Sequence, residues 1–264
     1  MRATNKKAAA LPFVPASPED EKRFARATET VLQKAPASGY AGVGTLAEKP
    51  MHAILKHYLS EDEDYHEVGV LDTDYVSDVR LGNTVYEVQS GSVFPMQKKV
   101  AHYLGATDCS VVVVHPMSWG GKLIRLDPKT GEVFSAKTYA LHEKPLWFLA
   151  DLYPLREFLA SDRLSFQLLF VEIEDYRLPH TRRGTREKLV RVPTRLLGEL
   201  TLKQTSDYAA LIPEELPVSF AAKEFADATH LRGRGVYSIL HVLSAAGALK
   251  EEKDEKGRFV FTRT

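Results

Sequence analysis

The stretch 76-VSDVRLGNTVYEVQSG-91 decides the fold, because it holds two strand-like runs joined by a two-residue turn. Gly82-Asn83 suits a type II′ turn, in which glycine tolerates the positive φ of the first central position. The register set by this turn places Asp78 directly opposite Glu87 on an antiparallel pair. Gln89 lies two residues beyond Glu87 and projects from the same face. The sequence therefore predicts that these three polar side chains converge on one hairpin.

Two carboxylates that face each other across a hairpin repel, and the repulsion can be relieved in two ways. A Mg²⁺ ion, or Mn²⁺ in its place, binds through one or two carboxylates while keeping several waters and a substrate phosphate. The pair would then be a metal site, with Glu67 on the preceding strand as a third acid or merely an edge-strand carboxylate. The alternative is a solvent-facing hairpin that Arg80 or a lysine neutralises.

The segments around the hairpin alternate between helical and strand patterns. The expected order is helix, strand, strand, strand, helix, strand, over residues 51–59, 66–71, 75–79, 84–89, 94–104 and 110–115. The unbroken apolar run 110-SVVVVH-115 is typical of a strand buried on both faces, and Cys109 is expected to pack beside it. Later in the chain we expect a hairpin at 122–126 and 132–136, a helix over 145–159, a strand over 166–174 and helical segments around 194–211.

This αβββαβ order, with Asp on one strand and Glu-x-Gln on the next, resembles the PD-(D/E)XK nuclease superfamily, also called restriction-endonuclease-like. The resemblance implies that Asp78 and Glu87 bind a metal ion that assists hydrolysis of DNA. Gln89 stands where the superfamily has a lysine that orients or activates the attacking water, and an amide can position water only by hydrogen bonding. In the superfamily this lysine sometimes comes from the following helix. Lys98 and Lys99 are the candidates for that role, or else surface lysines.

A closer resemblance runs from residue 49 to residue 264. The run 51-MHAILKHYL-59, the motif 87-EVQSG-91 and 175-DYR-177 are similar to those of a family of uncharacterised bacterial proteins. Its members combine the nuclease-like core, an "EIQT"-type motif and a C-terminal winged helix. The resemblance implies the fold and layout of the chain rather than its reaction.

Three other polar residues near this core have a structural and a functional interpretation. His52 and Lys56 share one face of the helix at 51–59, so they are candidates for phosphate contacts, although a surface pair is favoured. His115 is expected to end the buried strand, where a structural role is favoured over a place at the rim of the site.

The last residues of the chain predict a winged helix. Helical patterns at 220–228 and 235–246 precede a hairpin formed by 248–252 and 258–262. The best candidates for phosphate contacts are Arg232, Arg234, Lys253, Lys256 and Arg258. The expected recognition helix exposes Tyr237, Ser238 and His241 rather than a basic row, so a protein-binding role is the alternative.

A second basic segment, 177-RLPHTRRGTREKLVR-191, holds six Arg or Lys residues against one acid. Each phosphate contact would add salt dependence to nucleic-acid binding. The alternative is an ordinary solvated loop or strand. The candidate nucleic-acid contacts here are Arg182, Arg183, Arg186, Lys188 and Arg191.

Composition sets wider limits on the protein. The 35 basic and 35 acidic residues cancel, so any basic surface must be local. The single cysteine excludes an internal disulfide, and no apolar run approaches the roughly 18 residues of a spanning helix, so a cytoplasmic protein without a membrane partner is expected. We expect a tail, helix and linker over 1–48, a nuclease-like domain over 49–212, and a winged-helix domain over 213–264.

The sequence thus predicts a Mg²⁺-dependent nuclease, a hydrolase acting on DNA and docked by its winged helix. A catalytically inactive DNA-binding or regulatory protein with the nuclease fold is the alternative, and the missing lysine of the motif favours it. A third possibility is a scaffold that binds a protein partner through the winged helix.

Overall fold

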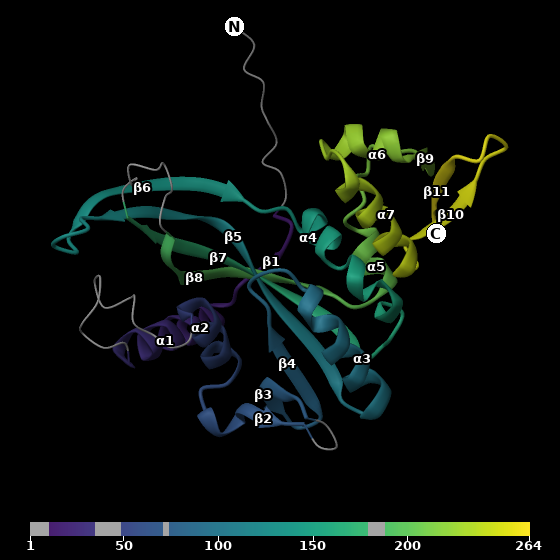
Figure 1. The fold of residues 1–264 in the computed structure, drawn as a ribbon. Coiled ribbons are helices and arrows are strands. Elements are labelled where there is room, and N and C mark those ends of the chain that lie inside the picture. Colours follow the sequence, from purple (N-terminus) through teal and green to yellow (C-terminus); the bar gives the residue numbers. More distant parts are fainter. Residues whose placement is uncertain (1–10, 35–48, 71–73, 179–187) are drawn as a thin grey trace, which may run out of the picture.

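The computed structural model describes residues 11–34, 49–70, 74–178 and 188–264. In these ranges the chain forms a mixed α/β fold around one large sheet, with a smaller sheet near the C-terminus (Figure 1). No helix in the described ranges is long and apolar enough to cross a membrane.

The hairpin and its neighbours follow the expected order. The elements are α2 (Pro50–Leu59), β2 (His66–Gly69), β3 (Val76–Leu81), β4 (Thr84–Val88), α3 (Gln97–Ala106) and β5 (Ser110–Leu126), with short 3₁₀ turns η2 (Glu63–Tyr65) and η3 (Phe94–Met96). The ladder pairs Leu81 with Thr84 around a turn in which Gly82 has a φ of 60°, which confirms the predicted register near the turn. β3 is antiparallel to β2 and β4, whereas β4 is parallel to β5. The crossover through α3 therefore joins two parallel strands.

The sheet extends well beyond this core. The remaining strands are β1 (Val14–Pro15), β6 (Val133–His142), β7 (Leu164–Arg177) and β8 (Lys188–Leu202). The strand order is β1-β8-β7-β5-β4-β3-β2, and β6 also pairs with β5. β5 has β4 beside its first half and β6 beside its second half, so the expected strand end at His115 is wrong: β5 continues to Leu126.

The helical segments expected around 194–211 are also largely wrong, because β8 pairs with β7 as far as Leu202. Within the expected segment, Thr194 and Leu197 of β8 have no partner in the ladder where the register shifts, and neither does Leu189 near the start of β8. Each unpaired residue shifts the alternation of inward and outward side chains by one position. The apolar residues of β8 are therefore spaced in a way that resembles a helix. Within the expected segment only α5 (Thr205–Ala209) is helical.

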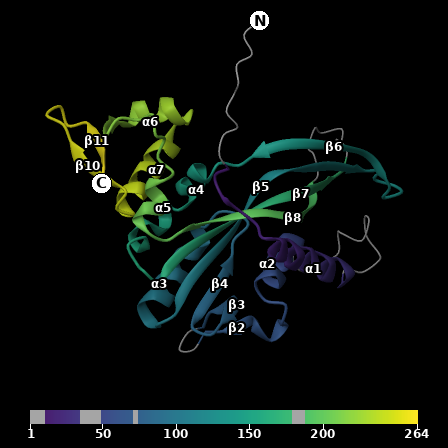
Figure 2. The ribbon, with the colours of Figure 1, turned by 180° about the vertical axis from the view of Figure 1, so that it is seen from behind.

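Helices cover both faces of the sheet (Figures 1 and 2). On one face α1 (Pro18–Lys34) and α2 pack against a cluster that includes Val114 and Leu169. On the other face α3, α4 (Pro145–Asp151) and η4 (Tyr153–Phe158) pack against Val113 and Leu168. The first part of β5, the predicted run 110–115, is therefore covered on both faces, as predicted, and Cys109 is a buried free cysteine. The helix expected over 145–159 is divided in two, because Pro154 cannot continue an α-helical ladder.

The C-terminal residues form a compact unit of two helices and a three-stranded sheet. Its elements are β9 (Ser219–Ala221), α6 (Ala222–Thr229), α7 (Arg234–Ala245), β10 (Leu249–Lys253) and β11 (Phe259–Arg263). The sheet order is β10-β11-β9. The buried side of α7, which includes Ile239 and Leu243, shares one apolar cluster with Leu149 and Leu152 of α4 and its C-terminal end. The unit is therefore fixed to the body through α7.

The bend in the middle of β5 depends on Gly121. Its φ is 146°, and a Cβ atom at this position would lie 1.9 Å from the carbonyl oxygen of Ile173 on β7. Gly121→Ala should therefore destabilise the protein by roughly 3 kcal/mol, because the two strands must move apart. Gly105→Ala is the matched control, since nothing lies within 4 Å of its Cβ position. Thermal denaturation should show a lower Tm for the first variant only, and equal Tm values would contradict this account of the bend.

Candidate active site

Asp78 lies where the β3–β4 hairpin opens. The last pair of the ladder is Val79 with Tyr86, so Asp78 and Glu87 are not a ladder pair as the extrapolated register predicted. Instead, Oδ2 of Asp78 accepts a hydrogen bond of 2.7 Å from the backbone N–H of Val88. The carboxylate thus closes the hairpin in place of a backbone carbonyl, which fixes its position near the end of β4.

His52 holds the second oxygen of Asp78. Its Nε2 lies 3.2 Å from Oδ1, and the two side chains are 26% and 16% exposed. Burial favours the neutral carboxyl, but the hydrogen bond and charge of His52, the Val88 N–H and the charge of Lys99 outweigh it and lower the pKa of Asp78. Asp78 is therefore an anion at neutral pH, and His52 belongs to the site rather than to a surface pair with Lys56.

Glu87 is the most buried carboxylate of the site, at 2% exposure. Lys99 Nζ donates to its Oε2 at 2.6 Å, and the Tyr103 hydroxyl donates to its Oε1 at 3.0 Å. Burial raises the pKa of Glu87 to about 7, and the charge of Asp78 adds to this rise although Lys99 and Tyr103 oppose it. Glu87 therefore exchanges its proton near neutral pH, which is unusual for a glutamate.

Of the two candidate lysines, only Lys99 reaches Glu87. Its Nζ also donates to the Val76 carbonyl at 2.7 Å, so the ammonium group bridges β3 and β4. Lys99 and Tyr103 are four residues apart on α3 and share the helix face that meets Glu87. Lys98 is exposed on another face of the helix.

Gln89 differs from the expectation. It follows the last residue of β4, and its backbone N–H donates to the Val114 carbonyl at 2.8 Å. Its side-chain Nε2 donates to the carbonyl of Ser92 in the next loop, and no hydrogen bond to Asp78 or Glu87 is present among the described residues. The amide is turned away because the chain leaves the sheet directly after Val88.

Glu67 does not join the carboxylates either. Its side chain is 59% exposed and accepts a hydrogen bond of 2.6 Å from the buried Lys56. In the described parts of the chain, no group of three or more His, Cys, Asp or Glu side chains suits a metal ion. The expectation of a third acid ligand therefore has no support, and Asp78 and Glu87 are left as a pair. Two carboxylates with water in the remaining positions fit Mg²⁺, which requires no larger protein cage.

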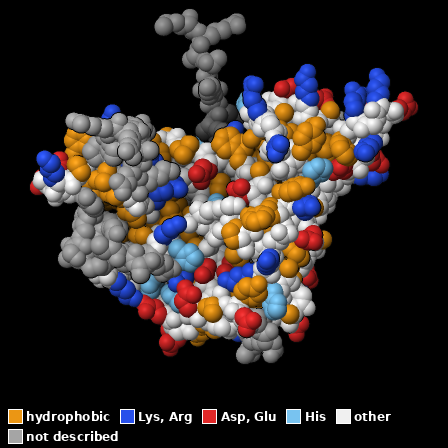
Figure 3. All heavy atoms as spheres, in the orientation of Figure 1, with side chains coloured by type: hydrophobic (Ala, Val, Ile, Leu, Met, Phe, Trp, Pro, Cys, Tyr) orange, Lys and Arg blue, Asp and Glu red, His pale blue; other side chains and the backbone are white. Residues whose placement is uncertain are grey.

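The residues expected to bind nucleic acid are divided between two regions. Arg182, Arg183 and Arg186 lie outside the described residues, as does the side chain of Lys188, whereas Arg191 is exposed near the start of β8. The five candidates of the C-terminal unit, Arg232, Arg234, Lys253, Lys256 and Arg258, are all exposed, and so are Lys223 and Lys250 of the same unit. Figure 3 shows Lys and Arg side chains projecting from this unit, with acidic side chains among them.

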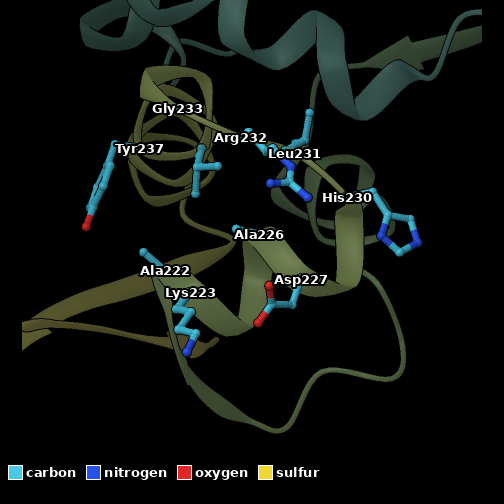
Figure 4. Close-up of a pocket in the computed structure, with 10 residues that line it drawn as sticks. Ala222, Lys223, Ala226, Asp227, His230, Leu231, Arg232, Gly233 and Tyr237 are labelled. Atoms are coloured by element: carbon cyan, nitrogen blue, oxygen red, sulfur yellow. The ribbon is translucent and has the colours of Figure 1, made fainter.

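A hollow of about 510 Å³ lies between α6 and the start of α7 (Figure 4). Lys223 and Asp227 of α6 line one side of it, and Arg232 and Tyr237 line the side nearer α7. In the hairpin of the same unit, Arg258 pairs with Asp254 at 2.7 Å. The cations of this unit are therefore only partly available to an anionic partner.

A known protein family matches this chain over the residues of the candidate site. The model of a domain of unknown function (DUF8091) matches residues 49–206, which is more than half of the chain. The chain belongs to this family. The DUF8091 match contains Asp78, Glu87, Lys99 and Tyr103, and the whole C-terminal unit follows it. No curated protein and no solved structure matched the chain.

Sequence reasoning missed Tyr103, and for His52 it favoured a surface pair with Lys56 over a place in the site. Tyr103 could have been found from its spacing of four residues after Lys99, once the helix was assigned. His52 had no such signal, because its contact with Asp78 depends on how α2 crosses the open end of the hairpin. The sequence shows the polar residues of each element but not the packing that joins the elements.

Removal of the Lys99 charge should lower the free energy of unfolding by an amount that depends on pH. Because the folded-state pKa of Glu87 lies above the usual glutamate value, its contribution to stability falls as the pH rises through about 7. Without Lys99 the buried carboxylate loses its counter-charge, so Lys99→Met should cost about 3 kcal/mol at pH 8 but much less at pH 6, where Glu87 takes up a proton. Urea denaturation at both pH values measures this difference.

The control is Lys98→Met, which removes a neighbouring exposed lysine and should change the free energy of unfolding by less than about 0.5 kcal/mol. A loss for Lys99→Met that is the same at pH 6 and pH 8 would contradict the raised pKa of Glu87.

Proposed function

We propose that this protein is a metal-dependent nuclease that hydrolyses phosphodiester bonds of DNA at Asp78 and Glu87. The observation that carries the proposal is the buried Glu87 carboxylate paired with Lys99 from the helix after β4. The sequence resembles PD-(D/E)XK nucleases in the Asp and Glu-x-Gln positions, and Lys99 supplies the charge that Gln89 lacks. The order α2-β2-β3-β4-α3-β5 is compatible with that nuclease core.

Asp78 and Glu87 would hold a Mg²⁺ or Mn²⁺ ion, which supplies a Lewis acid and lowers the pKa of bound water. The residues of this chain prepare the site for such an ion. The His52 contact keeps Asp78 ionised and in place, and the Val88 N–H fixes its orientation. The Lys99 ammonium group donates to Glu87, and its charge also acts on Asp78, so it can stabilise negative charge on a phosphate during hydrolysis.

The C-terminal unit is proposed to be a winged helix that contacts the DNA backbone. Its order of helix, helix and hairpin supports this assignment. One side of α7 is buried against α4 and η4, however, so a full-length insertion of α7 into the major groove is not favoured. The exposed positions at the start of α7, including Arg234 and Tyr237, and Lys256 in the hairpin suit contacts with phosphates, which position DNA without reading its sequence.

The second candidate function is a DNA-binding or regulatory protein that keeps the nuclease fold without catalysis. The side chain of Gln89 favours it, because the amide is held by Ser92 and does not occupy the catalytic lysine position. This candidate predicts salt-sensitive DNA binding that needs no metal and survives Glu87→Gln. The two functions therefore differ in cleavage rather than in binding.

Cleavage of plasmid and oligonucleotide DNA with Mg²⁺ or Mn²⁺ tests the leading proposal. Asp78→Asn, Glu87→Gln and Lys99→Met should each lower the cleavage rate by at least about 100-fold, because each removes charge from the reacting centre. Lys98→Met and Glu67→Gln should cleave at the wild-type rate. Equal rates for the wild type and the Asp78 and Glu87 variants would reject the assignment, and no cleavage by the wild type would favour the second candidate.

The proton on Glu87 should compete with the metal. Because the pKa of this carboxyl is about 7, cleavage at limiting Mg²⁺ should rise between pH 6 and pH 8. A tenfold higher Mg²⁺ concentration should move the midpoint to lower pH, since the ion displaces the proton. A midpoint that is independent of the Mg²⁺ concentration would show that Glu87 does not bind the ion.

A further inference from the structure

One face of the sheet carries an unbroken row of four side chains on strands that extend beyond the nuclease-like core. The pairing registers join Lys137 of β6 to Leu123 of β5, Leu123 to Asp175 of β7, and Asp175 to Arg191 of β8. Directly paired residues point to the same side of a sheet, so the four side chains share one face. Arg177, two residues after Asp175 on β7, projects from that face as well.

Two hollows lie along this face and join. The first, of about 420 Å³, is lined at one end by Met51, the neighbour of His52 in α2, and by Ser90 in the loop after β4. The second, of about 540 Å³, covers β5, β6 and β7 and contains the row. Glu143 and Arg191 line both hollows, so together they form one groove, which we call the arm groove. One end of the arm groove is lined by Met51 and Ser90, which are sequence neighbours of His52 and Gln89, and the other end lies over β5, β6 and β7.

The charges of the arm groove suit a polyanion. Its two acids are already engaged: Glu143 accepts a hydrogen bond of 2.7 Å from the Ser118 N–H, and Asp175 forms an ion pair with Arg177. In the described ranges Lys137 and Arg191 form no ion pair with another side chain. The cations that line the groove are Lys49, Lys137, Arg177 and Arg191.

The walls of the arm groove are apolar between these charges. Met51 and Ile173 line the first hollow, and Leu123, Tyr139 and Leu141 line the second. Cations that follow a backbone, with apolar and aromatic surfaces on which bases stack, are the features of sites for a single nucleic-acid strand. Pockets of a few hundred Å³ are of the size that holds a small molecule, such as a single nucleotide.

We propose that the arm groove binds a single nucleic-acid strand and leads it to Asp78 and Glu87. The proposal rests on the proposed nuclease function and names its substrate class: single-stranded DNA, or duplex DNA with a single-stranded end. Arg191 and Lys137 bind phosphates on either side of the Leu123–Asp175 pair, while Tyr139 offers its ring to a base.

Fluorescence anisotropy in EDTA tests this proposal without catalysis. The probes are a labelled oligothymidylate of about 20 nucleotides and a blunt duplex of the same length. The wild type should bind the single strand more tightly than the duplex. A Lys137→Ala/Arg191→Ala double variant should bind the single strand about tenfold more weakly, with a log–log salt slope lower by about 1.4, since two phosphate contacts are lost. Both positions are exposed, so the variant should fold.

The matched control is Arg195→Ala, which removes an exposed arginine from the same strand, β8, where it faces Glu21 rather than the groove. It should bind like the wild type. Equal affinity of the double variant and the wild type for the single strand, or a preference for the duplex, would overturn the proposal. Lack of nucleic-acid binding at low salt would also overturn it, and would leave an acidic protein segment as the better occupant.

The outcomes separate the arm groove from the nuclease proposal. Groove-dependent binding of the single strand without any cleavage by the wild type would reject the nuclease and keep the groove. Cleavage that depends on Asp78 and Glu87, together with binding that ignores Lys137 and Arg191, would keep the nuclease and reject the groove.

Discussion

The buried contact between Glu87 and Lys99 is the interaction on which the rest of the site depends. A carboxylate that is only 2% exposed destabilises the folded protein unless a cation and hydrogen-bond donors surround it. Lys99 supplies the positive charge for Glu87, and Lys99 and Tyr103 supply the hydrogen bonds. The contact ties α3 to β4, and the bond from Lys99 to the Val76 carbonyl ties α3 to β3 as well. Lys99 therefore joins β3 and β4 beyond the last ladder pair, and α2 holds the second carboxylate, Asp78, through His52.

Much of this fold could be predicted from short patterns of neighbouring residues in the sequence. Gly82-Asn83 set the register of the hairpin, and the apolar run after Cys109 identified the strand that is buried on both faces. The order of the C-terminal helices and hairpin followed from the periodicity of their apolar residues. These features depend on residues close together in the chain, so the sequence displays them directly.

The errors arose where distant segments decide the structure. The register shifts at Thr194 and Leu197 made β8 look like a helix in the sequence. A residue is unpaired only relative to the partner strand β7, so the sequence of β8 alone does not show which residues are unpaired. The role of His52 depends on the crossing of α2 over the hairpin, and the choice of Lys99 over Lys98 depends on which face of α3 meets the sheet. The long second half of β5 forms one wall of the arm groove, which no local pattern of residues indicated.

Binding of Mn²⁺, followed by electron paramagnetic resonance at pH 8, tests the central claim most directly because it reports on the two carboxylates without a substrate. We predict that the wild type binds Mn²⁺, that Mg²⁺ displaces it, and that Asp78→Asn and Glu87→Gln each weaken binding by about tenfold or more. Absence of Mn²⁺ binding by the wild type, or undiminished binding by both variants, would contradict a metal site at Asp78 and Glu87.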